Sequence, residues 1–463
     1  MKQTELLSPA GTLKNMRYAF AYGADAVYAG QPRYSLRVRN NDFMDENLAI
    51  GIKEAHDLGK KFYLTSNLMP HNSKIKSYIK DMSPIIDMHP DALIMSDPGL
   101  IMMARERWPE MPVHLSVQAN TVNFAAVKFW QSVGIERIIL SRELSLDEIK
   151  EIRQQCPDME LEVFVHGALC IAYSGRCLLS GYFNHRDPNQ GTCTNACRWG
   201  YKSTPSEKNA EGVYKPKTQT SDMGDERHPD ADEIMFLEEA HRPGEQMPVE
   251  EDEHGTYIMN SKDLRAVEHV KQLVDIGIDS LKIEGRTKSH YYVARTAQSY
   301  KQAILDASQG KEFNPELLGV LENLANRGYT DGFYQRHHTH EYQNYMQGNS
   351  ISRQQQFVGE IIAYNNETGM AEIDVKNKIK IGDKLELIKP AGNEDIILNN
   401  MQDMQGNAMT EAKGGGYKIQ IALDTVMDTV MDTGTDTGMD TGIDKDRLER
   451  GLIARYIDNP IIS

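Results

Sequence analysis

The sequence predicts an α/β fold: a (β/α)8 TIM-like barrel with a cysteine-rich segment and a long insertion, followed by a small C-terminal β-barrel. In the first 300 residues, short apolar strand candidates alternate with helix-length segments about every 20–35 residues, a pattern typical of βαβ units and a parallel sheet. The strand candidates end in polar residues, and after residue 350 only short strands follow. No glycine-rich dinucleotide loop follows the first strand, which argues against a doubly wound sheet.

Eight strand candidates fit the barrel, each short, apolar and partly β-branched. They are Glu5–Leu7, Ala24–Ala29, Lys61–Ser66, Ala92–Met95, Val113–Val117, Arg137–Leu140, Glu162–Val165 and Ser280–Glu284. A ninth, Tyr257–Asn260, is one more than the barrel uses, so we expect it in an elaboration after the seventh strand.

Helices are expected between these strands and after the last one. The clearest candidates are Thr12–Tyr22, Asp45–Leu58, Lys262–Val274, Lys288–Gln309 and Pro315–Asn326. Asp45 is expected to cap the second helix, whose Leu48, Ile52 and Ala55 form one apolar stripe.

The chain is long enough for two or three domains. We predict a barrel over residues 1–200 and 256–310, with its cysteine-rich metal segment at 162–199, and an acidic insertion at 201–255. A helical linker is expected at 311–350 and a small β-barrel domain at 351–463. Its segment 425–444 is a low-complexity insert of five tetrads, from TVMD to TGID, which we interpret as a slipped repeat in a hairpin loop.

The formal net charge of −16 by itself argues against an RNA substrate, because phosphate binding needs Lys and Arg. Two segments, 222–253 and 424–447, together carry all of this negative charge, so the rest of the chain is neutral. No apolar run reaches the roughly 20 residues that a membrane span needs. RNA therefore remains a possible substrate, and Lys376, Lys378, Lys380 and Lys384 are candidate backbone contacts.

Four of the five cysteines lie within 28 residues, with the spacing C-x6-C-x15-C-x3-C: Cys170, Cys177, Cys193 and Cys197. The sequence has no evident signal peptide, so we expect a reducing compartment, which disfavours disulfides. Four thiolates suit zinc or an iron–sulfur cluster. Zinc ribbons prefer two C-x2-C pairs, so the spacing favours iron–sulfur while leaving zinc open.

Charged residues on the last two barrel strands form a candidate catalytic site. Alternation along a strand places these side chains on the inward faces: Glu162, Phe164 and His166 on one strand, and Lys282, Glu284 and Arg286 on the other. A buried carboxylate needs a partner, so we predict that Glu162 pairs with Lys282. His166 is a candidate acid or base, or a donor to a metal ligand. Arg286 and Arg176 are candidates for gripping a small dianion through bidentate bonds.

The residues around the cysteines resemble the signature of the collagenase-like peptidase family of unclassified type: EVFVHGALC, AYSGRC and LSGY. Further matches are ELLSPAG from Glu5, GADAVYAG from Gly23, NSKDL from Asn260, KIEGR from Lys282 and QQFVGE from Gln355. Family members studied in RNA or ubiquinone metabolism are oxygen-independent hydroxylases with a 4Fe–4S cluster. The resemblance implies such a cluster on the four cysteines and a barrel fold.

The resemblance is strongest to members that convert the wobble uridine of tRNA to 5-hydroxyuridine. It implies a cytoplasmic tRNA-modifying enzyme, a tRNA anticodon loop as partner and prephenate as co-substrate, with no membrane or DNA partner. Arg37 and Arg39 join Arg176 as candidates for binding prephenate or RNA phosphate, and the catalytic candidates are Glu162, His166, Lys282 and Arg286.

Other functions stay open. A peptidase needs an activated nucleophile or a metal-bound water, and the sequence has neither G-x-S-x-G nor H-E-x-x-H. The remaining alternatives are a hydroxylase acting on ribosomal RNA or a ubiquinone precursor, and a zinc-stabilised RNA-binding module.

Overall fold

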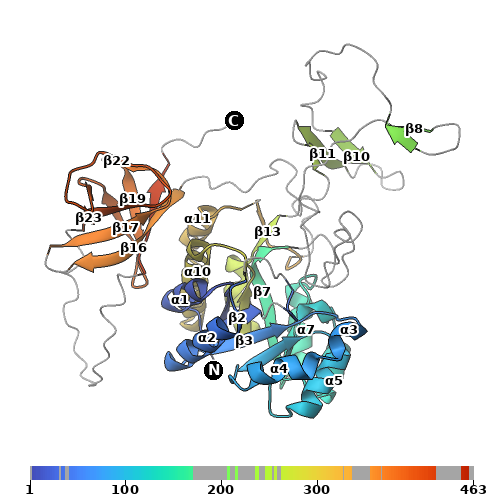
Figure 1. Cartoon of the computed structure of the whole chain (residues 1–463). Coiled ribbons are helices and arrows are strands. Elements are labelled where there is room, and N and C mark those ends of the chain that lie inside the picture. The colour runs from blue at the N-terminus through green and yellow to red at the C-terminus, as the bar shows by residue number, and fades with distance from the viewer. Residues whose placement is uncertain are drawn as a thin grey trace.

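The computed structural model describes residues 3–30, 33–36, 41–169, 262–326, 328–335, 355–365, 368–423 and 450–457, and short strands between 206 and 257. Eight parallel strands form a barrel beneath the helices (Figure 1). The barrel is closed because β14 pairs with both β1 and β7. The strands are β1 (Glu5–Pro9), β2 (Ala26–Gly30), β3 (Lys61–Ser66), β4 (Ala92–Met95), β5 (Val113–Leu115), β6 (Arg137–Ile139), β7 (Glu160–Ala168) and β14 (Ser280–Ile283). The predicted TIM-like barrel and its eight strands are confirmed.

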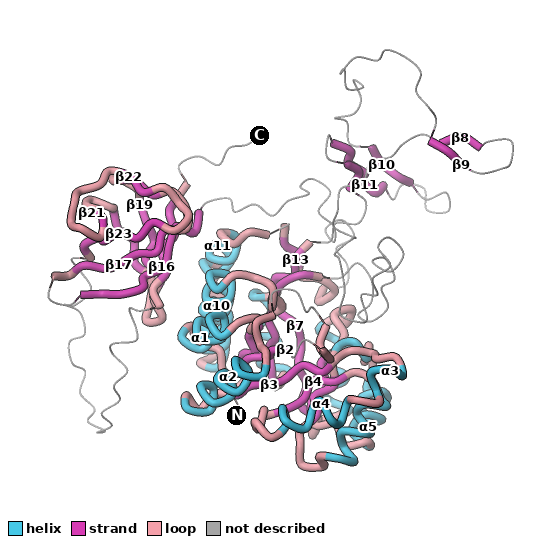
Figure 2. Tube along the Cα trace, in the orientation of Figure 1, coloured by secondary structure: helices cyan, strands magenta, loops and turns pink. Residues whose placement is uncertain are grey.

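Helices cover the outside of the barrel (Figure 2). They are α1 (Leu13–Ala21), α2 (Asp45–Asp57), α3 (Asn72–Ile75), α4 (Tyr78–Ile86), α5 (Pro98–Arg107), α6 (Phe124–Ser132), α7 (Leu146–Gln155), α9 (Val270–Ile276), α10 (His290–Ser308) and α11 (Glu316–Glu322). Thr12 caps α1 by accepting from the Asn15 amide. The predicted cap of α2 is wrong, because Met44 occupies the N-cap and Asp45 is the first helical residue. Its predicted stripe of Leu48, Ile52 and Ala55 is buried.

Side-chain alternation separates an apolar outer face of the barrel from a polar interior. On β14, Leu281 and Ile283 are fully buried in the main hydrophobic core, which includes residues of the surrounding helices. On the same strand, Ser280 and Lys282 bind carboxylates inside the barrel. The apolar side chains of β14 pack against the surrounding helices and stabilise the barrel. Its polar side chains face the barrel interior.

The segment before β14 differs from the prediction. Lys262–Val274 was predicted to be helical, but β13 (Asp263–Arg265) and the short helix η4 (Val267–His269) precede α9. β7 is long enough to pair with β14 on one side and, at its end, antiparallel with β13, which in turn pairs with β15 (Tyr329–Thr330). This pairing with the end of β7 holds 263–265 extended.

Short antiparallel strands lie between β7 and β13, in two small sheets. The strands are β8 (Ser206–Lys208), β9 (Tyr214–Pro216), β10 (Met235–Glu238), β11 (Gln246–Asp252) and β12 (Gly255–Tyr257). The ninth strand candidate overlaps β12 at Tyr257, outside the barrel, in the elaboration where it was expected.

The C-terminal domain is a seven-stranded antiparallel sheet in the order β20-β19-β24-β16-β17-β23-β21, with a two-stranded sheet of β18 and β22. The strands are β16 (Gln355–Asn365), β17 (Met370–Val375), β18 (Ile379–Lys380), β19 (Lys384–Ile388), β20 (Glu394–Ile397), β21 (Gln402–Asp403), β22 (Glu411–Ala412), β23 (Tyr417–Ala422) and β24 (Leu452–Tyr456). The predicted C-terminal domain of short β-strands is confirmed, but among the described residues no strand pairing closes the seven-stranded sheet into the predicted barrel. In the described part of the chain, no helix is long and apolar enough to cross a membrane.

This domain packs against α1 and α10 of the barrel (Figure 1). Arg295 of α10 binds both carboxylate oxygens of Glu386 at 3.0 Å, and both side chains are buried. The Phe357 ring stacks on Tyr291 with 4.7 Å between ring centroids. Ile388 and Leu452 belong to the same hydrophobic core as the barrel, so the two domains share buried apolar and ionic contacts.

Candidate functional site

Two adjacent strands, β7 and β14, bring the predicted ion pair together inside the barrel. They pair in parallel, with Ser280 opposite Glu162 and Lys282 opposite Phe164. Lys282 Nζ donates to Glu162 Oε1 at 2.7 Å, and the two side chains are only 4% and 0% exposed. The predicted pairing of Glu162 with Lys282 is confirmed.

Glu162 has a second cationic partner, Arg137, which the sequence analysis did not identify. Arg137 at the start of β6 lies 3.3 Å from Glu162, 2.6 Å from Glu5 and 2.8 Å from Glu160. Burial acts to lower the pKa of Arg137, but the charges of Glu5 and Glu162 outweigh it and raise that pKa. The alternation of Arg137 and Ile139 beside Glu160 and Glu162 is the sequence signal that indicates this contact.

Lys282 lies between two aromatic rings. Its Nζ lies 4.4 Å from the centre of the Tyr28 ring and 5.4 Å from that of Phe164. Burial lowers the pKa of Lys282, and the neighbouring Glu162 offsets part of this effect. Buried lysines with a lowered pKa can exchange protons with a substrate, so Lys282 has the properties of an acid or base.

Arg286 joins the carboxyl ends of three strands, which is where TIM-barrel enzymes carry their active sites. Its Nη1 donates to Ser35 Oγ at 2.7 Å and to Thr65 Oγ1 at 2.9 Å, and its Nη2 donates to the Leu36 carbonyl. A Cβ on Gly30 would lie 2.3 Å from Arg286 Nη1, so only glycine leaves room for this arrangement. The guanidinium is thus held at the mouth of the barrel.

A further cation at the mouth is Arg142, which follows β6. Its guanidinium carbon lies 3.7 Å from the centre of the Phe164 ring, and Nη2 lies 3.8 Å from Glu284 Oε2. Tyr28 Oη lies 3.4 Å from the same Glu284 oxygen. Arg286 and Arg142 therefore lie at the mouth, where hydroxyls, a carboxylate and an aromatic ring hold them. Lys282 lies deeper, in the barrel interior, and shares the Phe164 ring with Arg142.

His166 does not share the inward face of Glu162 and Phe164, so that prediction is wrong. The register between β7 and β14 shifts after Lys282, and His166 instead of Val165 lies opposite Ile283, which faces the helices. The His166 ring packs among three tyrosine rings, Tyr292, Tyr300 and Tyr329, with centroid distances of 5.7, 5.5 and 5.5 Å.

The outer position of His166 changes its chemistry. Its Nδ1 lies 3.3 Å from Tyr300 Oη, and its buried Nε2 has no hydrogen-bond partner among the described residues. Burial lowers the pKa of His166 to about 3. The ring is neutral at physiological pH and supports the end of β7, the strand that leads to the first cysteine.

The metal-ligand candidates Cys170, Cys177, Cys193 and Cys197 lie outside the described residues, as do Arg176, Arg37 and Arg39. In the described ranges, no three His, Cys, Asp or Glu side chains are grouped so that they could hold a metal ion. Leu169 is the last described residue before the cysteines, and it directly follows β7.

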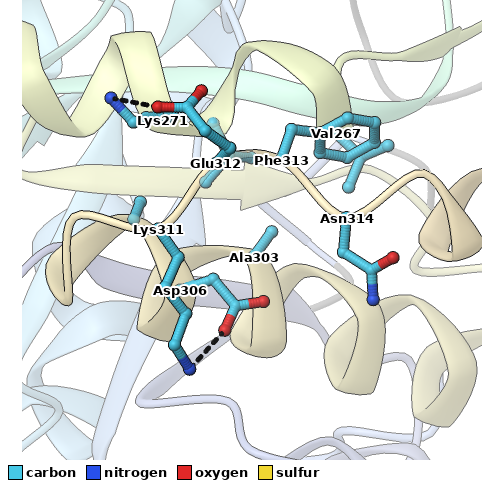
Figure 3. A pocket seen from close by; sticks show the side chains of 10 residues that line it. Val267, Lys271, Ala303, Asp306, Lys311, Glu312, Phe313 and Asn314 are labelled. Carbon is cyan, nitrogen blue, oxygen red and sulfur yellow. Dashed lines mark hydrogen bonds and ion pairs between the residues drawn. The ribbon is translucent and has the colours of Figure 1, made fainter.

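A small pocket lies away from the mouth, between η4, α9 and the end of α10 (Figure 3). Its charged lining residues form ion pairs with each other: Lys271 with Glu312 at 3.7 Å and Lys311 with Asp306 at 3.5 Å. This mutual neutralisation leaves no charge directed at a ligand, so the mouth remains the candidate site.

Comparison with known proteins agrees with the architecture. Residues 11–344 match peptidase family U32, and residues 353–431 match the C-terminal domain of peptidase family U32. The chain is 61% identical to tRNA hydroxylation protein P of Escherichia coli (strain K12), over 90% of this chain and 93% of that protein. It is 60% identical to the protein of the same name from Haemophilus influenzae, over 89% and 92%.

A relative named for a different activity also matches nearly the whole chain. The protein named collagenase from Porphyromonas gingivalis is 29% identical, over 90% of this chain and 94% of that protein.

Proposed function

This chain belongs to peptidase family U32, and on that premise we propose that it is an enzyme that hydroxylates tRNA. The observation that carries the proposal is the 61% identity to a tRNA hydroxylation protein over nine-tenths of both chains. At this identity the match includes the barrel and the C-terminal domain together.

The barrel supports an enzyme over a purely structural module. Arg286 and Arg142 lie at the carboxyl ends of the strands, the end of the fold that carries chemistry in TIM barrels, and Lys282 lies below them in the barrel interior. Buried ionic groups cost stability unless they have partners. Here Lys282 and Arg142 lie beside carboxylates, and Arg286 donates to two hydroxyls and a carbonyl. The arrangement fits a preorganised polar site.

The more specific proposal is that the enzyme converts the wobble uridine of a cytoplasmic tRNA to 5-hydroxyuridine, with prephenate as the source of the hydroxyl group. Anticodon loops present unstacked bases to proteins, which suits entry of one base into a barrel mouth. Prephenate is a dicarboxylate, and arginines bind carboxylates through bidentate hydrogen bonds. Arg286 is the described candidate for this contact, and Arg176, Arg37 and Arg39 are the candidates outside the described residues.

We further propose that Cys170, Cys177, Cys193 and Cys197 hold a 4Fe–4S cluster. Four thiolates are the usual ligand set of such a cluster, and the cysteine segment begins directly after β7, at the mouth. A bound cluster would supply Lewis-acid or electron-transfer chemistry. In this proposal Lys282 holds a proton beside the substrate, Glu162 sets its charge, and Arg286 and Arg142 orient anionic groups.

His166 has a supporting role in this proposal. Its ring is on the outer face of β7 and buried among tyrosines, so it fixes the strand that presents the cysteines. His166 would therefore affect the site indirectly, by holding the backbone of β7 in place.

The test of function is the nucleoside content of tRNA from a bacterial strain that lacks its own tRNA hydroxylation proteins and expresses this chain. We expect mass spectrometry to detect 5-hydroxyuridine, and to detect much less with Lys282→Met. Unchanged tRNA with newly hydroxylated ribosomal RNA, or with a restored ubiquinone precursor, would favour the other hydroxylase alternatives. Cleavage of gelatin by the purified chain without tRNA hydroxylation would favour a collagenase-like peptidase.

The cluster has its own test, on protein purified without air. We expect about four iron and four acid-labile sulfide per chain, with Cys193→Ala losing both. Cys156→Ala is the matched control, because Cys156 is buried against α6 and its Sγ contacts the Phe124 carbonyl at 3.7 Å. Stoichiometric zinc without sulfide would overturn the cluster and favour the zinc-stabilised RNA-binding alternative.

A further inference from the structure

Four cations lie together at one edge of the barrel mouth. Arg33 follows β2, Lys74 is in α3, Lys76 follows α3, and Lys80 is in α4. β2 and β3 are adjacent parallel strands, with Gly30 opposite Thr65, so the segments that follow them emerge side by side. We call Arg33, Lys74, Lys76 and Lys80 the basic rim.

The basic rim carries excess positive charge that the described part of the chain does not neutralise. Lys76 and Lys80 are exposed, and the Arg33 side chain is 51% exposed. Asp81 pairs with Arg33 at 2.9 Å, but none of the three lysines has an ion-pair partner among the described residues. Burial and then the charge of Arg33 lower the pKa of Lys74, which shows that like charges are close together here.

The C-terminal domain shows the opposite pattern. Its lysines pair with carboxylates of the same domain at distances between 2.6 and 3.1 Å: Lys376 with Asp374, Lys378 with Glu411, Lys384 with Asp395, Lys389 with Glu394 and Lys418 with Glu372. Three of the four lysines predicted to contact RNA are in this set. A phosphate would have to displace a carboxylate there, whereas at the basic rim it would neutralise excess positive charge.

The basic rim is held by a rigid base. Tyr34 Oη donates to Asp81 at 2.5 Å, and Arg33 Nη2 donates to Ser77 Oγ at 2.9 Å. The rings of Tyr34 and Tyr78 are fully buried and meet edge to face at 5.0 Å. The cations therefore occupy a fixed place relative to the barrel, on the side away from the C-terminal domain, where α3 and α4 lie (Figure 1).

The basic rim is continuous with the mouth. Ser35 and Leu36, the residues that accept hydrogen bonds from Arg286, follow Arg33 and Tyr34 in one short described segment. An RNA strand lying on these cations would therefore pass directly beside the fixed guanidinium of Arg286.

We propose that the basic rim binds the phosphate backbone of tRNA next to the nucleotide that enters the barrel mouth. The inference rests on the proposed tRNA-hydroxylating function and assigns the backbone contact to the barrel edge. Phosphate contacts of this kind position a nucleic acid without reading its sequence.

The test is tRNA binding by the full chain purified without air, measured by fluorescence anisotropy with labelled tRNA over a series of salt concentrations. The rim variant is Lys74→Gln, Lys76→Gln and Lys80→Gln combined. We expect its affinity to fall about tenfold or more and its salt slope to fall by about 1 per lysine. The matched control removes the same charge from paired lysines: Lys378→Gln, Lys384→Gln and Lys418→Gln, with an expected change below about twofold.

Two outcomes would overturn the assignment to the basic rim, and a third would overturn the proposed function. Equal losses in the rim and control variants would mean that only net charge matters, and would overturn the assignment to the basic rim. Unchanged binding in a rim variant with an unchanged melting temperature would also overturn it. If the wild-type chain bound no tRNA at all, the proposed function itself would fail.

Discussion

The barrel interior and the domain interface both bury charge, but they pair it differently. In the interior, Glu162 has two cationic partners, and one of these, Arg137, also binds Glu5 and Glu160. At the interface, Arg295 forms one bidentate pair with Glu386, and Gln355 and Asn393 supply neutral donors to the same carboxylate. Glu162 therefore has two cationic partners, whereas among the described residues Glu386 has one.

This difference determines how much stability is lost when one partner is removed. An arginine cannot give up its proton in a protein, so Arg295 without Glu386 would remain as a buried, unpaired charge. Lys282 without Glu162 can become neutral, because burial already lowers its pKa. The loss of Glu162 should therefore cost less stability than the loss of Glu386.

The largest effect is expected from Glu386→Gln, at about 3–5 kcal/mol of unfolding free energy. Denaturant unfolding measures it, with Glu372→Gln as the control. Glu372 pairs with Lys418, which is 56% exposed, so its loss should cost less than about 1 kcal/mol. Combining Glu386→Leu with Arg295→Met should recover much of the stability, since both charges are then gone. Failure of the double variant to recover would contradict the unpaired-charge explanation.

A smaller cost, about 1–3 kcal/mol, is expected for Glu162→Gln by the same measurement at neutral pH. Arg137 keeps Glu5 and Glu160, and Lys282 can shed its proton. If Glu162→Gln lowered the unfolding free energy as much as Glu386→Gln, a second cationic partner would make no difference to the cost.

The ion pairs of these two regions also differ in whether they can be predicted from the sequence. Strand alternation and barrel closure place Glu162 beside Lys282, because the seventh and last strands must be neighbours. Arg295 and Glu386 are 91 residues apart, on a helix and a strand of different domains, and no periodicity relates them. The position of His166 was missed because alternation assumes an unbroken register, and the shift after Lys282 breaks it.

A substitution at the barrel mouth tests whether the position of Arg286 matters for activity. Gly30→Ala would place a Cβ 2.2 Å from Ser35 Oγ and 2.3 Å from Arg286 Nη1, so Arg286 must move. We expect a cost of about 1–3 kcal/mol from overpacking and a loss of tRNA hydroxylation of about 100-fold from misplacement. Gly319→Ala in α11 meets no atom within 4 Å and is the control. Full activity in Gly30→Ala would show that the position of Arg286 is not needed.

The smallest change in unfolding free energy at neutral pH is expected from His166→Phe. This substitution should instead change how stability depends on pH in the acid range. Burial lowers the pKa of His166 to about 3, from an ordinary value of 6.5. Between these values the unfolded chain binds a proton that the folded chain does not, so stability falls as the pH falls, by about 1.4 kcal/mol per pH unit. The interior His114 has a pKa lowered well below its usual range, by burial and by Arg137, and contributes in the same direction.

His166→Phe should therefore remove about half of the histidine part of this slope, measured by denaturant unfolding between pH 6.5 and about pH 4.5. Carboxylates with a lowered pKa, such as Glu360 at the domain interface, lose their contribution only below that range. The exposed His71→Phe should leave the slope unchanged. An unchanged slope in His166→Phe would mean that the ring binds a proton in the folded chain, which would restore His166 as a candidate acid or base.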